Sequence, residues 1–432
     1  MKITKLRNLS GKDYKKIINR SAGNYRAVMS VAKKIMEDVK QNSDKAVIKY
    51  SKKFNGVSAN YSIQVSEKEI KEAYKQVDKK IIKALQQIIK NITAVQKNQL
   101  KSKKDTVVTT EKGISVWREW RPIEKVGIYI PGGKAVYPSS VLMTAIPAQI
   151  AGCKEIIMCS PAGKKGKIPA PTLVAADMIG LKNIYKVGGA EAIAAMVYGT
   201  QTIPSVYKIF GAGNTYVTAA KILALQTVSI DMPAGPSEVL IITDETANPK
   251  FIAADLLADG EHGEDSACVL LTTSEKIAGE TIKEITKQLE SLPTRERVKK
   301  SFEKYGLIAV VNSLNEAIEF SNKYAPEHLE IMTKDAESLV KKIINAGSVF
   351  LGDWTAKSSG DYATGANHVL PTGGTAKMYP PLGVEAFGKW MQVQKCTKEG
   401  LLKIIETIET IAEIEGLPAH KNSVSERFKK YG

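Results

Sequence analysis

The chain has 432 residues, of which 43% are hydrophobic and 25% are charged, so it contains enough apolar sequence for two cores of ordinary size. No segment approaches the run of about 20 apolar residues that a membrane-spanning helix needs. The charged opening, Met1 to Arg7, lacks the apolar core of a secretory signal. These features argue against a membrane protein and lead us to expect a cytoplasmic one.

The net charge of +17 raises the question of a nucleic-acid partner. The lysines concentrate on amphipathic helical segments, such as 71–104, and in the tail 421–430. Aromatic residues make up only 6% of the chain, and they form no stacking platform or recognition motif. We therefore expect a solvated basic face that attracts anionic cofactors, and no nucleic-acid partner.

The four cysteines, Cys153, Cys159, Cys268 and Cys396, show no CxxC spacing and are too few for a disulfide framework. We expect each of them to be reduced and buried in a core. Cys153 has an alternative role, because a thiolate can trap an aldehyde as a covalent intermediate. However, no histidine precedes His262 in the chain to activate this thiol locally.

Residues 1 to about 105 are predicted to be helical, because apolar residues recur there at helical spacing, and 61–65 is the one strand expected among them. From Val107 the period changes, and a two-stranded element is expected at 107–110 and 114–117. Further strands are expected at 126–130, 155–159, 184–187, 207–210 and 228–231, with helices at 141–150, 172–179, from 190 and from 214. This alternation indicates right-handed βαβ units and a parallel sheet.

The same alternation restarts after Gly235 and Pro236. Strands are expected at 239–243, 268–272, 307–311, 329–332 and 348–351, with helices at 250–258, 281–291, 313–323 and 336–344. A last helix carries one apolar stripe from Leu401 to Ala412 and ends at Gly416. This stripe needs a partner, either the protein's own lobe or a second subunit.

The predicted fold class is therefore α/β, with two Rossmann-like lobes built on parallel sheets. We assign residues 1–24 to a helical N-terminal arm and residues 382–432 to a helical C-terminal dimerisation tail. Residues 25–106 and 239–381 are expected to form the first lobe, with the zinc and acid–base residues, and 107–238 the second lobe, on the side of NAD.

Candidate chemical groups centre on the four histidines. Asp259 and His262 are spaced i, i+3 at a helix end, which suits two ligands of one metal ion, although a solvated acidic loop is the alternative. Glu327 and His328 adjoin each other between a helix and a strand, an arrangement that suits general acid–base chemistry. Asp361 and His368 lie on a glycine-rich loop that we expect at the carboxyl edge of a sheet. His420 follows Glu415, just past the last helix.

Three strand-to-helix turns contain glycines that would let backbone N–H groups meet a phosphate. They are Pro131-Gly132-Gly133, Gly188-Gly189-Ala190 and Gly211-Ala212-Gly213-Asn214. None is a full GxGxxG motif, and one such turn would be a weak signal. Three of them in one α/β lobe indicate a nucleotide.

Taken together in chain order, these residues resemble the histidinol dehydrogenase family over nearly the whole chain. The segments that carry the resemblance are 127–133, 231–238, 261–263, 324–329, 347–352, 367–372 and 415–420. The resemblance implies the last step of histidine biosynthesis, a four-electron oxidation of L-histidinol to L-histidine through the aldehyde that reduces two NAD. It also implies a homodimer with a zinc site shared between the subunits.

The resemblance assigns a role to each candidate residue. It implies that Zn²⁺ is held by Asp259, His262, Asp361 and, from the other subunit, His420. It makes Glu327 and His328 catalytic, with His328 taking the hydroxyl proton and Glu327 activating a water for the second oxidation. Substrate would contact the zinc ligands and His328, together with Ser237 and Glu415. NAD would contact Tyr129, Glu191 and Asn214, and His368 would hold its loop.

Three positions depart from the family pattern: Asp259 and Glu191 replace glutamines, and Ala212 replaces a proline. Aspartate binds zinc more strongly than an amide oxygen but dampens its Lewis acidity, and an ionised Glu191 can only accept hydrogen bonds. One alternative is an NAD-dependent dehydrogenase of another amino or sulfonated alcohol, which we would expect to lack Glu327, His328 or Glu415. Another is a non-redox protein, such as a hydrolase or a basic binding module, which leaves the glycine turns unexplained.

Overall fold

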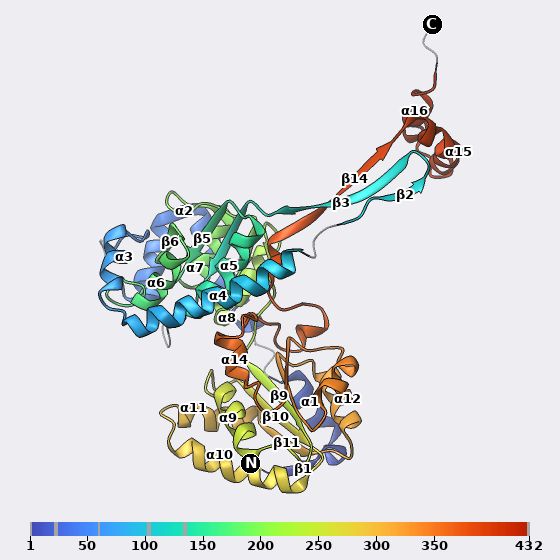
Figure 1. The fold of residues 1–432 in the computed structure, drawn as a ribbon. Coiled ribbons are helices and arrows are strands. Elements are labelled where there is room, and N and C mark those ends of the chain that lie inside the picture. Colours follow the sequence, from blue (N-terminus) through green and yellow to red (C-terminus); the bar gives the residue numbers. More distant parts are fainter. Residues whose placement is uncertain (1, 21–24, 59–60, 102–104, 133–135, 430–432) are drawn as a thin grey trace.

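The computed structural model describes residues 2–20, 25–58, 61–101, 105–132 and 136–429. Two α/β units lie one above the other, and a long arm extends from them with the C-terminal helices at its tip (Figure 1). This confirms the predicted α/β class. Among the described helices, none is long and apolar enough to cross a membrane.

The five-stranded unit contains a parallel sheet in the order β6-β5-β4-β7-β8. Its strands are β4 (Lys125–Tyr129), β5 (Glu155–Cys159), β6 (Asn183–Tyr185), β7 (Lys208–Phe210) and β8 (Ser229–Ile230). Its helices are α5 (Pro138–Ala151), α6 (Ala170–Met178), α7 (Gly189–Tyr198) and α8 (Thr215–Ala224). Each lies at or near its predicted position, because short apolar strands bounded by glycine turns give a clear pattern.

Helices α2 (Met29–Asn55), α3 (Glu67–Tyr74) and α4 (Lys79–Lys101) cover this same unit. α2 packs against α7 and α8, α3 against α6, and α4 against α5. Their predicted assignment to the other lobe is therefore wrong. Helical spacing identifies an apolar face, such as Ala32, Ile35 and Val39, which joins one core with Ile193 and Val197. It does not reveal which sheet will cover that face.

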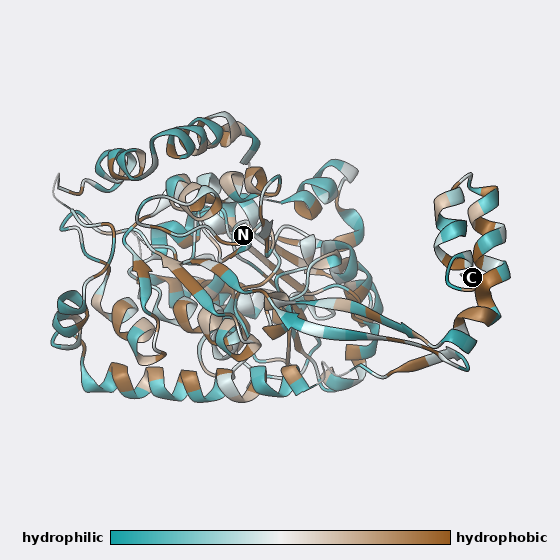
Figure 2. Ribbon diagram, turned by 90° about the horizontal axis from the view of Figure 1, so that it is seen from above, coloured by the Kyte–Doolittle hydropathy of each residue, from teal (hydrophilic) through white to brown (hydrophobic). Residues whose placement is uncertain are grey.

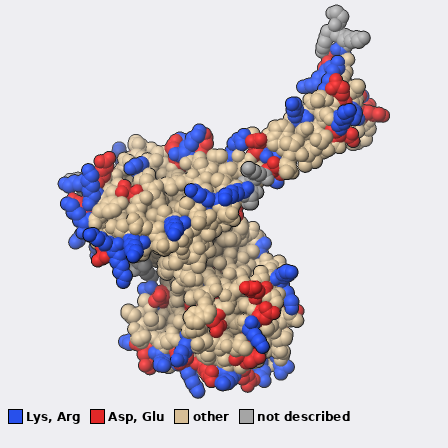
Figure 3. Space-filling model, in the orientation of Figure 1, with Lys and Arg blue, Asp and Glu red and all other residues tan. Residues whose placement is uncertain are grey.

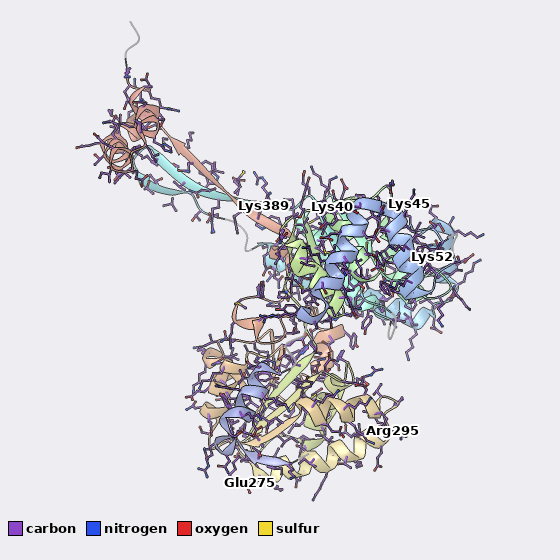
Figure 4. All side chains as sticks on the ribbon, turned by 180° about the vertical axis from the view of Figure 1, so that it is seen from behind. Lys40, Lys45, Lys52, Glu275, Arg295 and Lys389 are labelled. Atoms are coloured by element: carbon purple, nitrogen blue, oxygen red, sulfur yellow. The ribbon has the colours of Figure 1, made fainter. Side chains whose placement is uncertain are left out.

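The outer face of α2 is basic. Lys40, Lys45 and Lys52 are exposed and lie along this helix on the outside of the molecule (Figure 4). Figure 3 likewise shows Lys and Arg side chains gathered at the outer end of the five-stranded unit, with acidic side chains among them. Such a distribution is typical of a solvated helical face.

The expected strand at 61–65 is reduced to a single antiparallel bridge between Gln64 and Tyr185.

The six-stranded unit is also fully parallel, in the order β1-β11-β10-β9-β12-β13. Its strands are β1 (Ile3–Lys5), β9 (Glu238–Thr243), β10 (Ala267–Thr272), β11 (Leu307–Val310), β12 (His328–Met332) and β13 (Ser348–Leu351). Its helices are α1 (Gly11–Asn19), α9 (Pro249–Gly260), α10 (Glu275–Glu290), α11 (Arg295–Tyr305), α12 (Leu314–Tyr324), α13 (Ala336–Leu339) and α14 (Lys357–Tyr362).

Three features of this unit differ from the prediction. The N-terminal segment is not a purely helical arm, because β1 pairs with β11 and becomes an edge strand of the sheet. Helix α11 was not predicted, since its mostly charged sequence buries only Val298, Ser301 and Phe302. Helix α14 was also missed, because its six residues include Ser358, Ser359 and Gly360 and resemble a loop.

The arm is a three-stranded antiparallel sheet in the order β14-β3-β2, tipped by two helices. Its elements are β2 (Val108–Glu111), β3 (Ile114–Pro122), β14 (Gly388–Cys396), α15 (Lys398–Ile414) and α16 (Pro418–Ser425). The predicted two-stranded element is present, but the tail after 382 is not purely helical. Strand β14 pairs with β3 along its whole length, and this long-range pairing has no local sequence signal.

Candidate active site

The amino ends of β9, β12 and β13 meet at one edge of the six-stranded sheet. His328 begins β12, where it is in register with Val239 of β9 and with Ser348, the first residue of β13. Helix α9 runs back from the opposite edge, so Asp259 in its last turn reaches the same place. Candidate residues from four separate segments are thus brought together around His328.

The sequence placed Asp361 at the carboxyl edge of a sheet, and that prediction is wrong. The chain reverses after β13, at Gly352 with its φ of +77°, and α14 returns to the amino edge. Asp361 Oδ1 then lies 3.5 Å from His328 Nε2, at the start of β12.

Ser237 and Glu327 form a polar cluster beside His328. Ser237 Oγ lies 2.9 Å from Asp259 Oδ1 and 3.1 Å from Glu327 Oε2, and the Glu238 N–H donates to the same Glu327 oxygen at 2.9 Å. Glu327 is buried, and burial raises the pKa of its carboxyl to about 8. This carboxyl can therefore exchange a proton near neutral pH.

His328 is oriented by a backbone carbonyl. Its Nδ1 lies 3.1 Å from the carbonyl oxygen of Glu238, and because a carbonyl only accepts hydrogen bonds, Nδ1 carries the proton in the neutral ring. The lone pair is then on Nε2, which is buried without a hydrogen-bond partner among the described residues. Burial alone would lower the pKa of His328, but the charges of Glu327, Asp361 and Asp259 outweigh it and raise that pKa above 6.5.

The three predicted zinc ligands of this chain lie near one another, with a lysine between two of them. His262 Nδ1 is 3.8 Å from Asp259 Oδ1, while Lys357 Nζ lies 2.8 Å from Asp259 Oδ1 and 3.0 Å from Asp361 Oδ2. In the part of the chain that the structure describes, no three histidine, cysteine or acidic side chains are arranged to hold a metal ion. In this arrangement the predicted ligands do not fit a zinc ion, because an ammonium already occupies the space between two of them.

The charges of this group follow from their contacts. Burial would raise the pKa of Asp259, but the charges of Lys357 and His328 lower it. In the same way, contacts with His328 and Lys357 outweigh burial at Asp361 and lower its pKa far below the usual value. Burial would lower the pKa of Lys357, but Asp259 and Asp361 raise it. Both carboxylates and the ammonium are therefore charged at neutral pH.

Sequence reasoning missed Lys357 together with two buried acids beside it. Asp255 lies one turn before Asp259 on α9, and Glu330 lies inside β12. Burial raises the pKa of both, and Glu330 is raised further by Asp255. The signal for Asp255 was its i, i+4 spacing from Asp259, whereas Glu330 sits within an apolar strand and carries no pattern of its own.

Two predicted site residues, Glu415 and His420, lie elsewhere. They are exposed at the tip of the arm, at the end of α15 and in α16. The arm holds these helices well away from both α/β units (Figures 1 and 2). Within one chain the structure therefore does not bring them to the group around His328.

The predicted NAD residues lie at the carboxyl edge of the five-stranded sheet. Tyr129 ends β4, and its hydroxyl accepts a hydrogen bond from the N–H of Gly189 at 3.1 Å. Asn214 caps α8, with its Oδ1 accepting from the N–H groups of Tyr216 and Val217. The buried Glu191 carboxyl, whose pKa burial raises to about 8, has no hydrogen-bond partner among the described residues.

The turn after β7 is held close to the end of β4. Gly211 has a φ of +107°, and a Cβ there would lie 2.2 Å from the Tyr129 carbonyl oxygen. The Gly211 N–H donates to Asp231 Oδ2 at 2.7 Å, and Lys221, which is ion-paired with Asp231, donates to the Gly211 carbonyl at 2.8 Å. Strands β4 and β7 flank the point where the strand order reverses, which is where open α/β sheets bind ligands.

His368 and the cysteines can be placed against their predictions. His368 Nδ1 lies 2.9 Å from the Asp361 carbonyl oxygen and its Nε2 lies 3.2 Å from Ser140 Oγ, so this residue holds its loop, as predicted.

Burial raises the pKa of Cys153 to about 12, which disfavours the thiolate that an aldehyde trap needs. Cys396 is exposed, so the expectation that every cysteine is buried is wrong. Gly133 lies outside the described residues.

Comparisons with known proteins agree with the observed fold. The family model for histidinol dehydrogenase matches residues 18–428. The histidinol dehydrogenase of Methanocaldococcus jannaschii is 47% identical over 429 residues, 99% of each chain, and that of Clostridium acetobutylicum is 45% identical, covering 98% of this chain and 97% of its own. The crystal structure of histidinol dehydrogenase from Elizabethkingia anophelis superposes with a TM-score of 0.92 at 45% identity, covering 97% of this chain and 96% of its own.

Proposed function

Because the chain belongs to the histidinol dehydrogenase family, we propose that it oxidises L-histidinol to L-histidine through the aldehyde. Two NAD are reduced in succession, in the cytoplasm, as the last step of histidine biosynthesis. The observation that carries the proposal in this chain is the buried pair of Glu327 and His328. The imidazole of that pair has its Nε2 lone pair free of hydrogen bonds among the described residues.

In the first oxidation, His328 Nε2 takes the proton of the substrate hydroxyl. The carbinol carbon then loses a hydride, which carries two electrons to NAD and leaves the aldehyde. The Glu238 carbonyl keeps Nδ1 protonated, so the same nitrogen always faces the substrate. The proton on Nε2 passes to solvent before the next step.

The second oxidation needs water. The Glu327 carboxylate takes a proton from a water molecule as the water oxygen adds to the aldehyde carbon, and it returns this proton to the former carbonyl oxygen to give the hydrate. His328 then removes a hydroxyl proton from the hydrate while a second hydride leaves to a second NAD, and the product is the carboxylic acid. The two oxidations therefore use both members of the pair.

We assign NAD to the carboxyl edge of the five-stranded sheet. The turn at 212–214 offers backbone N–H groups at the start of α8, where an anion is stabilised. The Asn214 cap uses Oδ1, and its amide nitrogen would donate to the cofactor. Tyr129 and Glu191 complete the predicted contacts, with Glu191 accepting hydrogen bonds from ribose hydroxyls.

Zinc remains a prediction from the resemblance. A zinc ion would supply a charge that binds the amine and imidazole of the substrate and so orients it. The predicted ligands Asp259 and Asp361 are instead engaged by Lys357, and neither of the two oxidation steps is routed through a metal.

A homodimer with a shared active site forms part of the proposal. Glu415 and His420 are predicted to contact substrate, yet they lie on the arm, far from the other candidate residues of their own chain (Figure 1). The arm also exposes apolar side chains, with Leu402 exposed to 55% and Ile414 to 77%. Both facts are accounted for if each arm lies against a second copy of the chain and places Glu415 and His420 in that copy's site.

The second candidate function is oxidation of another amino alcohol by the same chemistry. The test is the rate of NADH formation with L-histidinol and with a panel of other amino and sulfonated alcohols. The proposal predicts that kcat/KM is highest for L-histidinol. A higher value for another alcohol would support the second candidate.

A further inference from the structure

Lys357 is a buried lysine to which neither the predicted roles nor the proposed oxidation steps give a function. It is the first residue of α14, and its side chain is 1% exposed. Its Nζ lies 2.8 Å from Asp259 Oδ1, on α9, and 3.0 Å from Asp361 Oδ2, one turn along α14. A single ammonium therefore bridges two carboxylates that belong to different helices.

Burial favours the pairing of these three charged groups with one another. An isolated charge in the interior is costly, so buried ammonium and carboxylate groups persist where they pair with one another. Asp259 is 0% exposed and Asp361 is 11% exposed at the side chain. The lysine supplies the positive charge that these two acids need, at ordinary hydrogen-bond distances.

The same place is unfavourable for a divalent ion while the lysine is there. Zinc binds carboxylate oxygens at about 2.0–2.2 Å, so an ion shared by Asp259 and Asp361 would lie within a few ångströms of the ammonium. The two cations would repel each other in a buried site, where screening by water is weak. The ammonium cannot diffuse away, because it is covalently attached to α14.

We propose that the ε-ammonium of Lys357 is the resident cation of this site. It occupies the position between Asp259 and Asp361 that a divalent ion would otherwise take, and the protein needs no bound metal there. Lys357 is also a positioning residue, since it fixes Asp361 Oδ2 while Oδ1 of the same carboxylate lies 3.5 Å from His328 Nε2. The inference concerns the cation of the site and does not depend on which alcohol is oxidised.

The test is the zinc content of the purified full-length protein, prepared without a histidine tag. Wild type and Lys357→Gln are equilibrated with excess Zn²⁺, passed through gel filtration and analysed for metal. We expect less than about 0.1 zinc per chain in wild type and about one in Lys357→Gln. The variant should bind zinc about 10- to 100-fold more tightly than wild type, which is the change in affinity seen when groups around a metal site are altered. EDTA should leave wild-type turnover unchanged.

Lys186→Gln is the matched control. Lys186 is also a buried lysine, paired with Glu69 at 2.8 Å in the five-stranded unit, so its loss should leave the zinc content at the wild-type level. One zinc per wild-type chain after gel filtration would overturn the proposal. If Lys357→Gln does not fold, the wild-type protein still tests the proposal. Zinc in the purified wild type, or loss of its turnover in EDTA, would overturn the proposal.

The outcome is separable from that of the proposed function. Zinc-free wild type that forms no NADH from L-histidinol would contradict the function and support the resident lysine. Zinc-loaded wild type that oxidises L-histidinol would do the reverse.

Discussion

The two ring nitrogens of His328 have different neighbours, and this difference defines the chemistry of the residue. Nδ1 faces a backbone carbonyl that cannot donate a proton, whereas Nε2 lies 3.5 Å from Asp361. The surrounding carboxylates raise the pKa of the imidazole above 6.5, and burial raises that of Glu327 to about 8. Both groups therefore become bases as the pH rises above 6.5, with the Glu327 carboxyl losing its proton near pH 8.

A base must be neutral to accept a proton, so activity should depend on the His328 pKa. Since that pKa is raised, wild-type kcat/KM for the alcohol should fall as the pH drops, with a midpoint above 6.5. His328→Asn should lower kcat by about 10²- to 10⁴-fold, the usual contribution of a general base. The measurement is the pH profile of NADH formation.

His368→Asn serves as the control for this experiment, because the half-buried His368 lies nearby and its ring nitrogens are within hydrogen-bond distance of Ser140 Oγ and of the Asp361 carbonyl oxygen. It should keep the acidic limb at the same pH. Full activity of His328→Asn, or loss of the acidic limb in His368→Asn, would contradict the assignment of the base.

Functional residues can be predicted from the sequence where they are close together along the chain. Glu327 and His328 are adjacent, and Asp259 and His262 share a helix face, so their chemistry could be proposed in advance. The role of Lys357 could not be predicted, because it depends on a contact with Asp259 of a different helix. Lysines are also common in this chain, so one more carries no signal. Only the folded protein shows that this particular lysine is buried between two acids.

At the scale of elements, the two sheets present opposite edges to the proposed chemistry. The predicted NAD residues end β4 or follow β6 and β7, whereas the acid–base residues precede or begin β12 beside the start of β9. Residues 231–237 join the two regions, and Thr218 and Thr372 hold this linker through hydrogen bonds to Ala234 and Gly235. The alternation of strands and helices was predictable from apolar spacing, but the edge occupied by α14 was not, because a six-residue helix leaves no periodic signal.

The turn at Gly211 should not tolerate a side chain. Gly211→Ala would place a Cβ 2.2 Å from the Tyr129 carbonyl oxygen and force alanine into a positive φ. We expect the free energy of unfolding to fall by about 1–3 kcal/mol, with a higher KM for NAD because the turn shifts. Chemical denaturation and NAD-dependent kinetics measure the two effects.

Gly279 provides a matched control, since it lies inside α10, where an added Cβ would meet no atom within 4 Å and the φ is not positive. Gly279→Ala should raise the free energy of unfolding by about 0.5–1 kcal/mol, because alanine favours helix. Equal stability of the two variants would refute the strain assigned to the Gly211 turn.

At the scale of the whole molecule, the arm is the feature whose position is not explained by packing within a single chain. Strand β14 and the terminal helices extend from the body (Figure 2). Apolar side chains of these helices, among them Leu402, Ile411 and Ile414, are exposed. The apolar stripe was visible in the sequence, where packing on the same lobe and packing on a second subunit stayed equally open. The fold separates the stripe from its own α/β units, which favours a second subunit.

A shared site predicts that two inactive variants can complement each other. His328→Asn removes the base from one chain, and Glu415→Ala removes a predicted substrate contact on the arm of the other. In a mixed dimer, one of the two sites combines an intact His328 with an intact Glu415. Co-expression in equal amounts should therefore restore about one quarter of wild-type activity, because half of the dimers are mixed. Activity no higher than that of the separate variants would contradict the shared site.

The most direct test of the account is the end point of the reaction with limiting L-histidinol and excess NAD. We expect two NADH for each L-histidinol, with L-histidine as the product, because Glu327 and His328 together support both proposed oxidations. A yield of one NADH would mean that the reaction stops at the aldehyde, and no NADH at all would contradict the account as a whole.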